Sequence, residues 1–174
     1  MYGHQPYHVQ YPHDFYQMTP DLQKTAPMLR QTENYGAIAA LNAASLTLPQ
    51  MLTYALQDEY LAQARYNNVI ETFGNIRTFE QIRAAEVRHI MALLPLFERY
   101  QIPLPIDESQ NFITTPVSLK AAFASGVQGE IDNIAMYDRF LAFNIPIDVS
   151  FVFSQLRNAS LNHLAAFERG LARG

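Results

Sequence analysis

The chain contains no cysteine among its 174 residues. That absence excludes a disulfide framework, a catalytic thiolate and an iron–sulfur cluster, so any metal site must be built from histidine and carboxylate side chains. No apolar run approaches the roughly 18 residues that a membrane span needs. The first residues also lack the basic start and the apolar core of a signal peptide. We therefore expect a cytoplasmic protein that makes no membrane contacts.

Charge is sparse as well. Charged residues make up 16% of the chain and the net charge is −4, so the sequence gives no indication of nucleic-acid binding. Apolar residues make up 49% of the chain. A chain of this length and composition can bury the core of one domain.

The first 36 residues are rich in tyrosine, histidine, proline and glutamine, and they show neither helical nor strand periodicity. We interpret residues 1–36 as an irregular N-terminal arm without a core of its own, and residues 37–174 as the folded domain. His4, His8 and His13 could bind metal adventitiously. The simpler interpretation is an extended arm that packs on its own domain or mediates contacts with a partner protein.

Four segments after the arm have the apolar spacing of helices, and none reads as a strand. We expect helices over about 48–73, 78–100, 118–143 and 148–171, with Gly74 ending the first. Thr78 and Gln81 form a predicted capping box for the second helix, and Asp148 is a predicted cap for the fourth.

The connections between these segments indicate how they pack. Short links join the first helix to the second and the third to the fourth, whereas a long proline-rich link, residues 102–116, separates the two pairs. The sequence therefore predicts an all-α fold, a four-helix bundle made of two antiparallel helical hairpins joined by a long crossover.

A four-residue motif occurs twice along these helices. The first copy comprises Glu59, Tyr66, Glu86 and His89, and the second comprises Glu130, Tyr137, Ser160 and His163. In both copies the glutamate precedes the tyrosine by seven residues. Residues three apart lie on one helical face, so Glu86 and His89 can reach the same ion. Ser160 breaks the repeat, because it occupies the position of Glu86.

The repeated glutamates need a compensating partner. Glu59 and Glu130 lie in otherwise apolar stripes, where an unpaired ionised carboxylate is costly or takes up a proton. A metal ion could compensate them, or a core network with a tyrosine hydroxyl or an arginine: Arg65, Arg83 or Arg139. Outside the arm the chain has only two histidines, both at equivalent motif positions. Metal ligation accounts for that distribution more economically than two unrelated core histidines.

The two tyrosines have two interpretations. Tyr66 and Tyr137 could each donate a hydrogen bond to a ligand carboxylate of the opposing hairpin and so orient it. Alternatively, each could be an aromatic core residue with a polar tip. Their equal offset from Glu59 and Glu130 makes the two interpretations about equally good.

Four segments carry a resemblance to a known superfamily. LQDEYLAQARY, AAEVRHIMALLPLFERY, GEIDNIAMYDRFL and NASLNHLAAFER resemble the four helices of a ferritin-like domain over about residues 37–172. The chain is most similar to the rubrerythrin-like branch, and within it to a bacterial family whose last helix carries an Asn-His-Leu-x-Ala-Phe signature. In this chain that signature comprises Asn162, His163, Leu164, Ala166 and Phe167.

The resemblance implies a ligand set for two iron or manganese ions. It implies that Glu59 and His89 bind the first ion, that Glu86 bridges the two ions, and that Glu130 and His163 bind the second. The superfamily has a sixth ligand, a glutamate, where this chain has Ser160. A serine cannot bridge two cations as a carboxylate does, so the site could hold two ions, a single ion or none.

The implied chemistry is that of an oxidase, peroxidase or ferroxidase acting with oxygen or peroxide. Because no cysteine is present, a di-iron enzyme of this kind would need an external reductant. The alternative is a non-catalytic structural or partner-binding bundle with a degenerate metal site, such as a spore-coat or assembly protein that uses residues 1–36 to contact partners. The resemblance also implies a homodimer.

Overall fold

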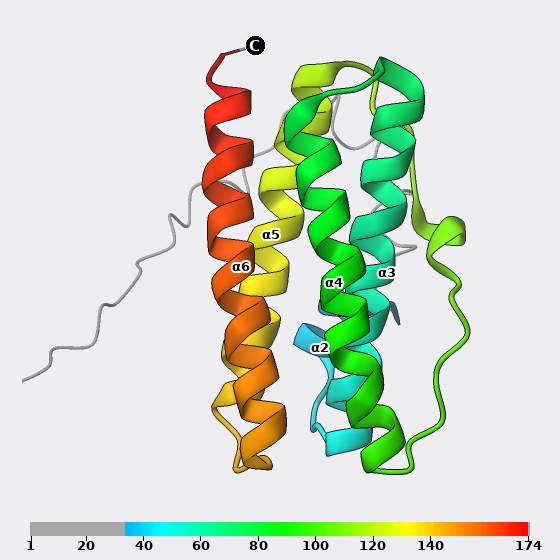
Figure 1. The fold of residues 1–174 in the computed structure, drawn as a ribbon, viewed down its shortest axis with the longest axis vertical. Helices are drawn as coiled ribbons and strands as arrows, with labels where there is room; N and C mark the ends of the chain where they lie inside the picture. Colours follow the sequence, from blue (N-terminus) through cyan, green and yellow to red (C-terminus); the bar gives the residue numbers. More distant parts are fainter. Residues whose placement is uncertain (1–33, 174) are drawn as a thin grey trace, which may run out of the picture.

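The computed structural model describes residues 34–173, and these residues form α-helices and short 3-10 segments with no strand (Figure 1). The expected all-helical fold is therefore confirmed over this range. His4, His8, His13 and the rest of the predicted arm up to residue 33 lie outside the described residues. The elements are α2 (Gly36–Asn42), α3 (Leu48–Phe73), α4 (Arg77–Arg99), η4 (Ser109–Phe112), α5 (Leu119–Leu141) and α6 (Ile147–Leu171).

The four long helices pack as a bundle. α3 lies antiparallel to α4 and α5 lies antiparallel to α6, each pair joined by a short connection (Figure 1). α3 also contacts α5, and α4 contacts α6, while residues 100–118 run back along the length of the bundle and place η4 against α3. None of the helices within residues 34–173 is long and apolar enough to cross a membrane.

Two apolar clusters fill the interior, and a polar layer separates them along every long helix. One cluster contains buried side chains from all four long helices: Met51, Leu52 and Leu56 of α3, Leu93 and Phe97 of α4, Met136 and Phe140 of α5, and Val149, Phe153 and Leu156 of α6. The other contains Tyr66 and Val69 of α3, Phe79 and Ile82 of α4, Ala122 and Phe123 of α5, and Phe167 of α6. Glu59, Glu86, Glu130 and His163 fall between the two sets. The apolar clusters therefore hold the four helices in register and enclose the polar side chains.

The helix ends differ from the predicted ones. Thr78 lies inside α4, whose N-cap is Ile76 without a side-chain cap, so the predicted capping box was wrong. The structure has its capping box at α3 instead, where the Thr47 side chain and the Gln50 side chain bond to each other's backbone N–H groups. Both pairs fit the sequence rule, and only tertiary packing selects the helix start.

The predicted Asp148 cap was also wrong. α6 begins one residue earlier, at Ile147, and its N-cap is Pro146. The Asp148 carboxylate instead accepts hydrogen bonds from the hydroxyl of Tyr100, at 2.7 Å, and from Arg99, at 2.8 Å. It therefore ties the start of α6 to the end of α4. Ser118 does cap α5, as its side chain accepts from the N–H of Ala121.

Helix α2 has no counterpart in the expected pattern, and long-range contacts hold it at both ends. Gly36 has a φ of +59°, and a Cβ there would lie 2.7 Å from a carboxylate oxygen of Asp58 on α3. That carboxylate accepts from the N–H of Ala37 at 2.9 Å. At the other end, Arg139 of α5 donates to the carbonyls of α2 residue 40 and its neighbours 41 and 43. Tyr35, just before α2, is buried and stacks on Phe112 of η4.

We expect Arg139→Ala to destabilise the fold by about 1.5–3 kcal/mol, because three carbonyls would lose charged hydrogen-bond donors. Arg157→Ala is the matched control, since Arg157 only pairs with Asp138 on the surface, and such pairs contribute about 0–1 kcal/mol. Urea denaturation would compare the two variants. Equal losses would show that α2 is not held by Arg139.

Candidate metal centre

The polar layer brings together all five side chains that the sequence singles out as metal ligands. α3 contributes Glu59, α4 contributes Glu86 and His89, α5 contributes Glu130, and α6 contributes His163. The three carboxylates are 1–3% exposed, and the two imidazoles are 7% and 9% exposed. Such burial is rare for ionisable groups without partners or metals.

These five side chains form two groups that share one member. Glu59, Glu86 and His89 each offer a ligand atom, and the three atoms lie within 4.8 Å of one another. Glu86, Glu130 and His163 form a second group by the same criterion. Glu86 thus lies between two three-residue sites, which is the position that a bridging carboxylate occupies.

His89 is held by two carboxylates through one ring nitrogen. Its Nδ1 lies 3.1 Å from Glu59 Oε2 and 2.7 Å from Glu86 Oε2. Burial alone would lower the pKa of His89, but the charges and hydrogen bonds of these two glutamates outweigh it and raise the pKa to about 10. In the metal-free protein His89 is therefore an imidazolium at neutral pH.

His163 occupies the equivalent place beside the second group. Its Nδ1 lies 3.2 Å from Glu86 Oε1 and 3.6 Å from Glu130 Oε1. Burial again opposes the charged form, but Glu130 and Glu86 raise the pKa of His163 to about 9. The two imidazole rings lie almost parallel, with centroids 5.4 Å apart. The buried Nδ1 of His163 has no partner of good hydrogen-bond geometry, which leaves it able to bind an ion.

The carboxylates respond differently to this environment. Burial raises the pKa of Glu59, although His89 partly offsets the effect. Burial would also raise the pKa of Glu86, but the imidazoles of His163 and His89 beside its carboxylate outweigh burial and lower it. Glu86 is therefore ionised at neutral pH, as a bridging ligand must be.

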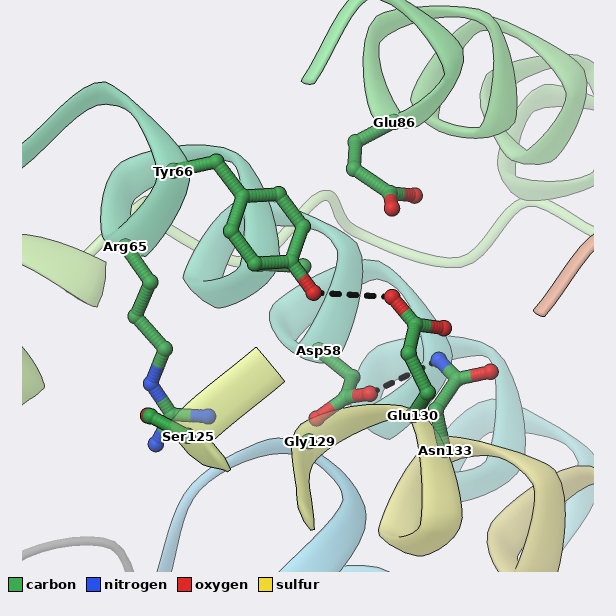
Figure 2. A pocket seen from close by; sticks show the side chains of 9 residues that line it. Asp58, Arg65, Tyr66, Glu86, Ser125, Gly129, Glu130 and Asn133 are labelled. Carbon is green, nitrogen blue, oxygen red and sulfur yellow. Dashed lines mark hydrogen bonds between the residues drawn. The ribbon is translucent and has the colours of Figure 1, made fainter. Parts of the chain in front are cut away.

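Of the two interpretations of the tyrosines, the structure agrees with the one in which each hydroxyl bonds to a carboxylate. Tyr66 of α3 donates to Glu130 of α5 at 2.8 Å (Figure 2), and Tyr137 of α5 donates to Glu59 of α3 at 2.6 Å. Burial raises the pKa of both phenols well above the ordinary value, so they remain neutral donors. Each tyrosine thus fixes the orientation of a carboxylate on the facing helix.

The three arginines considered as alternative partners do not contact these carboxylates. Arg83 lies beside Asn67, and Arg139 binds the carbonyls at the end of α2. Arg65 forms no ion pair with another residue in the range 34–173. Tyrosine and histidine therefore provide all the hydrogen-bond donors around Glu59 and Glu86, apart from a long 3.5 Å contact from Asn133 to Glu59.

Ser160 belongs to a second polar chain, which the sequence analysis missed. Its hydroxyl donates to Oδ1 of Asn133 at 2.7 Å, and the amide nitrogen of Asn133 donates to Asp58 at 2.8 Å (Figure 2). Asp58 in turn accepts from Ala37, which starts α2. Burial raises the pKa of Asp58 to about 7, against the effect of its hydrogen bonds from Ala37 and Asn133.

A signal for this second chain is present in the sequence. Asn133 follows Glu130 by three residues and precedes Tyr137 by four, so all three share one face of α5. Asp58 directly precedes Glu59 in α3, and it lies four residues before Ala62, so Asp58 and Ala62 share one face of that helix. A polar residue that interrupts the apolar stripe of a helix needs a buried hydrogen-bond partner, as a charged residue does.

We expect both imidazoles of the metal-free protein to stay protonated throughout the physiological pH range. A raised pKa in the folded state stabilises the fold fully below about pH 6.5. That stabilisation is lost as pH rises through the folded pKa values of about 9 and about 10. NMR titration of the His89 and His163 rings would measure this directly, and midpoints near 6.5 would contradict the cluster geometry.

Comparisons with known proteins show a shared fold but identify no family. No family model matches the chain, and no curated protein does. Among solved structures, the chain is similar to the crystal structure of a hypothetical protein from Methanococcus jannaschii DSM 2661, with a TM-score of 0.67 and 23% sequence identity. The likeness covers 76% of this chain and 83% of that one. It therefore shows that the two proteins share a fold.

Proposed function

We propose that the protein is a ferritin-like metalloprotein that binds iron or manganese in the core of its bundle. The observation that carries the proposal is the shared position of Glu86 between two buried ligand groups, one with His89 and one with His163. Antiparallel pairing of α3 with α4 and of α5 with α6, and the long link between the pairs, support a ferritin-like arrangement.

The donor set suits these metals. Imidazole nitrogen together with carboxylate oxygen is a ligand combination that iron and manganese accept. Glu59 and His89 would hold the first ion, Glu130 and His163 the second, and Glu86 would bridge them. Bound iron or manganese would supply the redox chemistry of an oxidase, peroxidase or ferroxidase acting on oxygen or peroxide.

The chain's own contribution to that chemistry is positioning and charge. Tyr137 and Tyr66 fix the carboxylates of Glu59 and Glu130, so the ligand oxygens are set before a metal arrives. The flanking apolar clusters cover the layer on both sides along the bundle. Cations bound there would therefore lie in a mostly apolar environment, where each carboxylate acts strongly.

A specific observation favours the second candidate, a structural bundle without metal chemistry. The hydrogen-bonded chain of Ser160, Asn133 and Asp58 fills the place of the missing sixth carboxylate with a set of satisfied neutral and acidic groups. The histidines can likewise neutralise the glutamates without an ion. In that case the protein would act through surfaces for protein partners, including residues 1–33 of the predicted arm or a homodimer contact.

An anaerobic ferrous titration distinguishes the two candidates. The metalloprotein proposal predicts two ions per chain, the second bound more weakly because Ser160 supplies no carboxylate, and ferric absorption after oxygen is admitted. Glu86→Gln removes the shared ligand and should abolish binding of both ions. Glu98→Gln, an exposed position on the same helix, is the matched control. Binding of less than about a tenth of an ion per chain at saturating iron would favour the structural candidate.

Metal binding should also release protons. Both imidazoles carry a proton at neutral pH in the metal-free protein, and a metal can bind each Nδ1 only after that proton leaves. We expect release of about two protons when both ions bind at pH 7. Calorimetry in buffers of different ionisation enthalpy would count them. An enthalpy of binding that is independent of the buffer would contradict the assignment of His89 and His163 as ligands.

A further inference from the structure

A small cavity between α3 and α5 reaches the second ligand group from outside the bundle. Its volume is about 20 Å³, and its inner wall includes Glu86, Glu130 and Asn133 (Figure 2). Its outer wall includes Ser125, which is exposed, and Arg65 and Gly129, which are half-buried. The cavity therefore connects solvent with the carboxylates on one side of the polar layer.

Gly129 lines this cavity. A Cβ at Gly129 would meet only Nη1 of Arg65, at 3.7 Å, which is an ordinary contact distance. Packing explains the glycine at position 126, one turn earlier, because a Cβ there would lie 2.9 Å from the ring of Phe167. Glycine is a poor helix former, so its presence at position 129 calls for another cause. The absent side chain is what leaves the passage between Arg65 and the interior.

Charge indicates what the passage would admit once metals are bound. Two divalent ions bring four positive charges, whereas the three ligands Glu59, Glu86 and Glu130 supply three negative ones and the histidines must be neutral. A carboxylate at position 160 would balance the cluster, but Ser160 cannot. The loaded centre is thus one negative charge short, and the ion beside Glu130 and His163 has lost a ligand.

Arg65 adds a second positive charge at the outer wall. Its Nη1 is the atom nearest to the space above Gly129. Asp58, which faces the same cavity, has a carboxylate already bonded to Ala37 and Asn133. A guanidinium at that place attracts small anions and disfavours cations.

We propose that the cavity between α3 and α5 is an entrance through which a small monoanion reaches the metal pair beside Glu86 and Glu130, where it supplies the negative charge that Ser160 withholds. A cavity of this size holds about one water molecule, so only the smallest anions, such as hydroperoxide and azide, could use it. This inference rests on the proposed metal site. It restricts reactants that use this path to small species and excludes bulky organic substrates from it.

Azide binding to the cobalt(II)-loaded protein tests the entrance, because visible cobalt absorption reports ligand binding without any turnover. Cobalt stoichiometry is measured first for each protein. Wild-type protein should bind one azide per chain. Arg65→Met should weaken azide affinity about three- to tenfold while the cobalt content stays unchanged, and Arg65→Lys should retain most of the affinity. Arg83→Met, which removes a half-buried arginine of α4, is the matched control and should bind azide as wild type does.

Two further variants test the passage and the missing ligand. Gly129→Leu should weaken or slow azide binding by obstructing the cavity, whereas Gln128→Leu, on the exposed side of α5, should not. Ser160→Glu should weaken azide affinity by about tenfold or more, because its carboxylate would supply the negative charge that the anion otherwise brings. If Gly129→Leu does not fold, the azide affinity of Arg65→Met is the deciding measurement.

The outcomes separate the entrance from the metal site. Wild-type protein that binds cobalt and azide, with the same azide affinity in Arg65→Met and Ser160→Glu, overturns the entrance and leaves the metal site standing. Wild-type protein that binds cobalt but no azide also overturns the entrance and leaves the metal site standing. Wild-type protein that binds no cobalt overturns both proposals.

Discussion

Mutual compensation among five buried ionisable side chains is the constraint on which this structure depends. Three carboxylates and two imidazoles occupy one layer of the bundle, between two apolar clusters. No one of them could be buried alone without a large desolvation cost. Glu86 contacts both histidines, so it is the residue through which the two halves of the layer compensate each other. The same arrangement that satisfies these charges is the one that presents two ligand groups.

The bundle maintains that layer through contacts between elements distant in sequence. The two tyrosines each connect α3 with α5, and Asp148 connects α6 with the end of α4. Helix α2 is bonded at one end to Asp58 and at the other to Arg139. Through Asn133, Asp58 also bonds to Ser160. The position that lacks a carboxylate is therefore part of the network that anchors α2.

The sequence predicts this structure well where one face of a helix carries the signal. Seven-residue and three-residue spacings place Glu59, Tyr66, Glu86 and His89 on inward faces, and the hydrogen bonds expected of the tyrosines are present. The sequence fails where long-range packing decides. Thr78 matches the capping rule as well as Thr47 does, and α2 depends on side chains 21 and 98 or more residues away. The hydrogen bonds of Asn133 could not be predicted from the sequence, because its partners Asp58 and Ser160 come from two other helices.

Bridging of two metal ions by Glu86 is the proposal on which the assigned function rests. It can be tested with crystals soaked in manganese and measured at a wavelength that reveals the anomalous signal of manganese. We expect two peaks, one within ligand distance of Glu59, Glu86 and His89 and the other beside Glu86, Glu130 and His163. No peak in this layer, with Glu86 still bonded to both imidazoles, would contradict it.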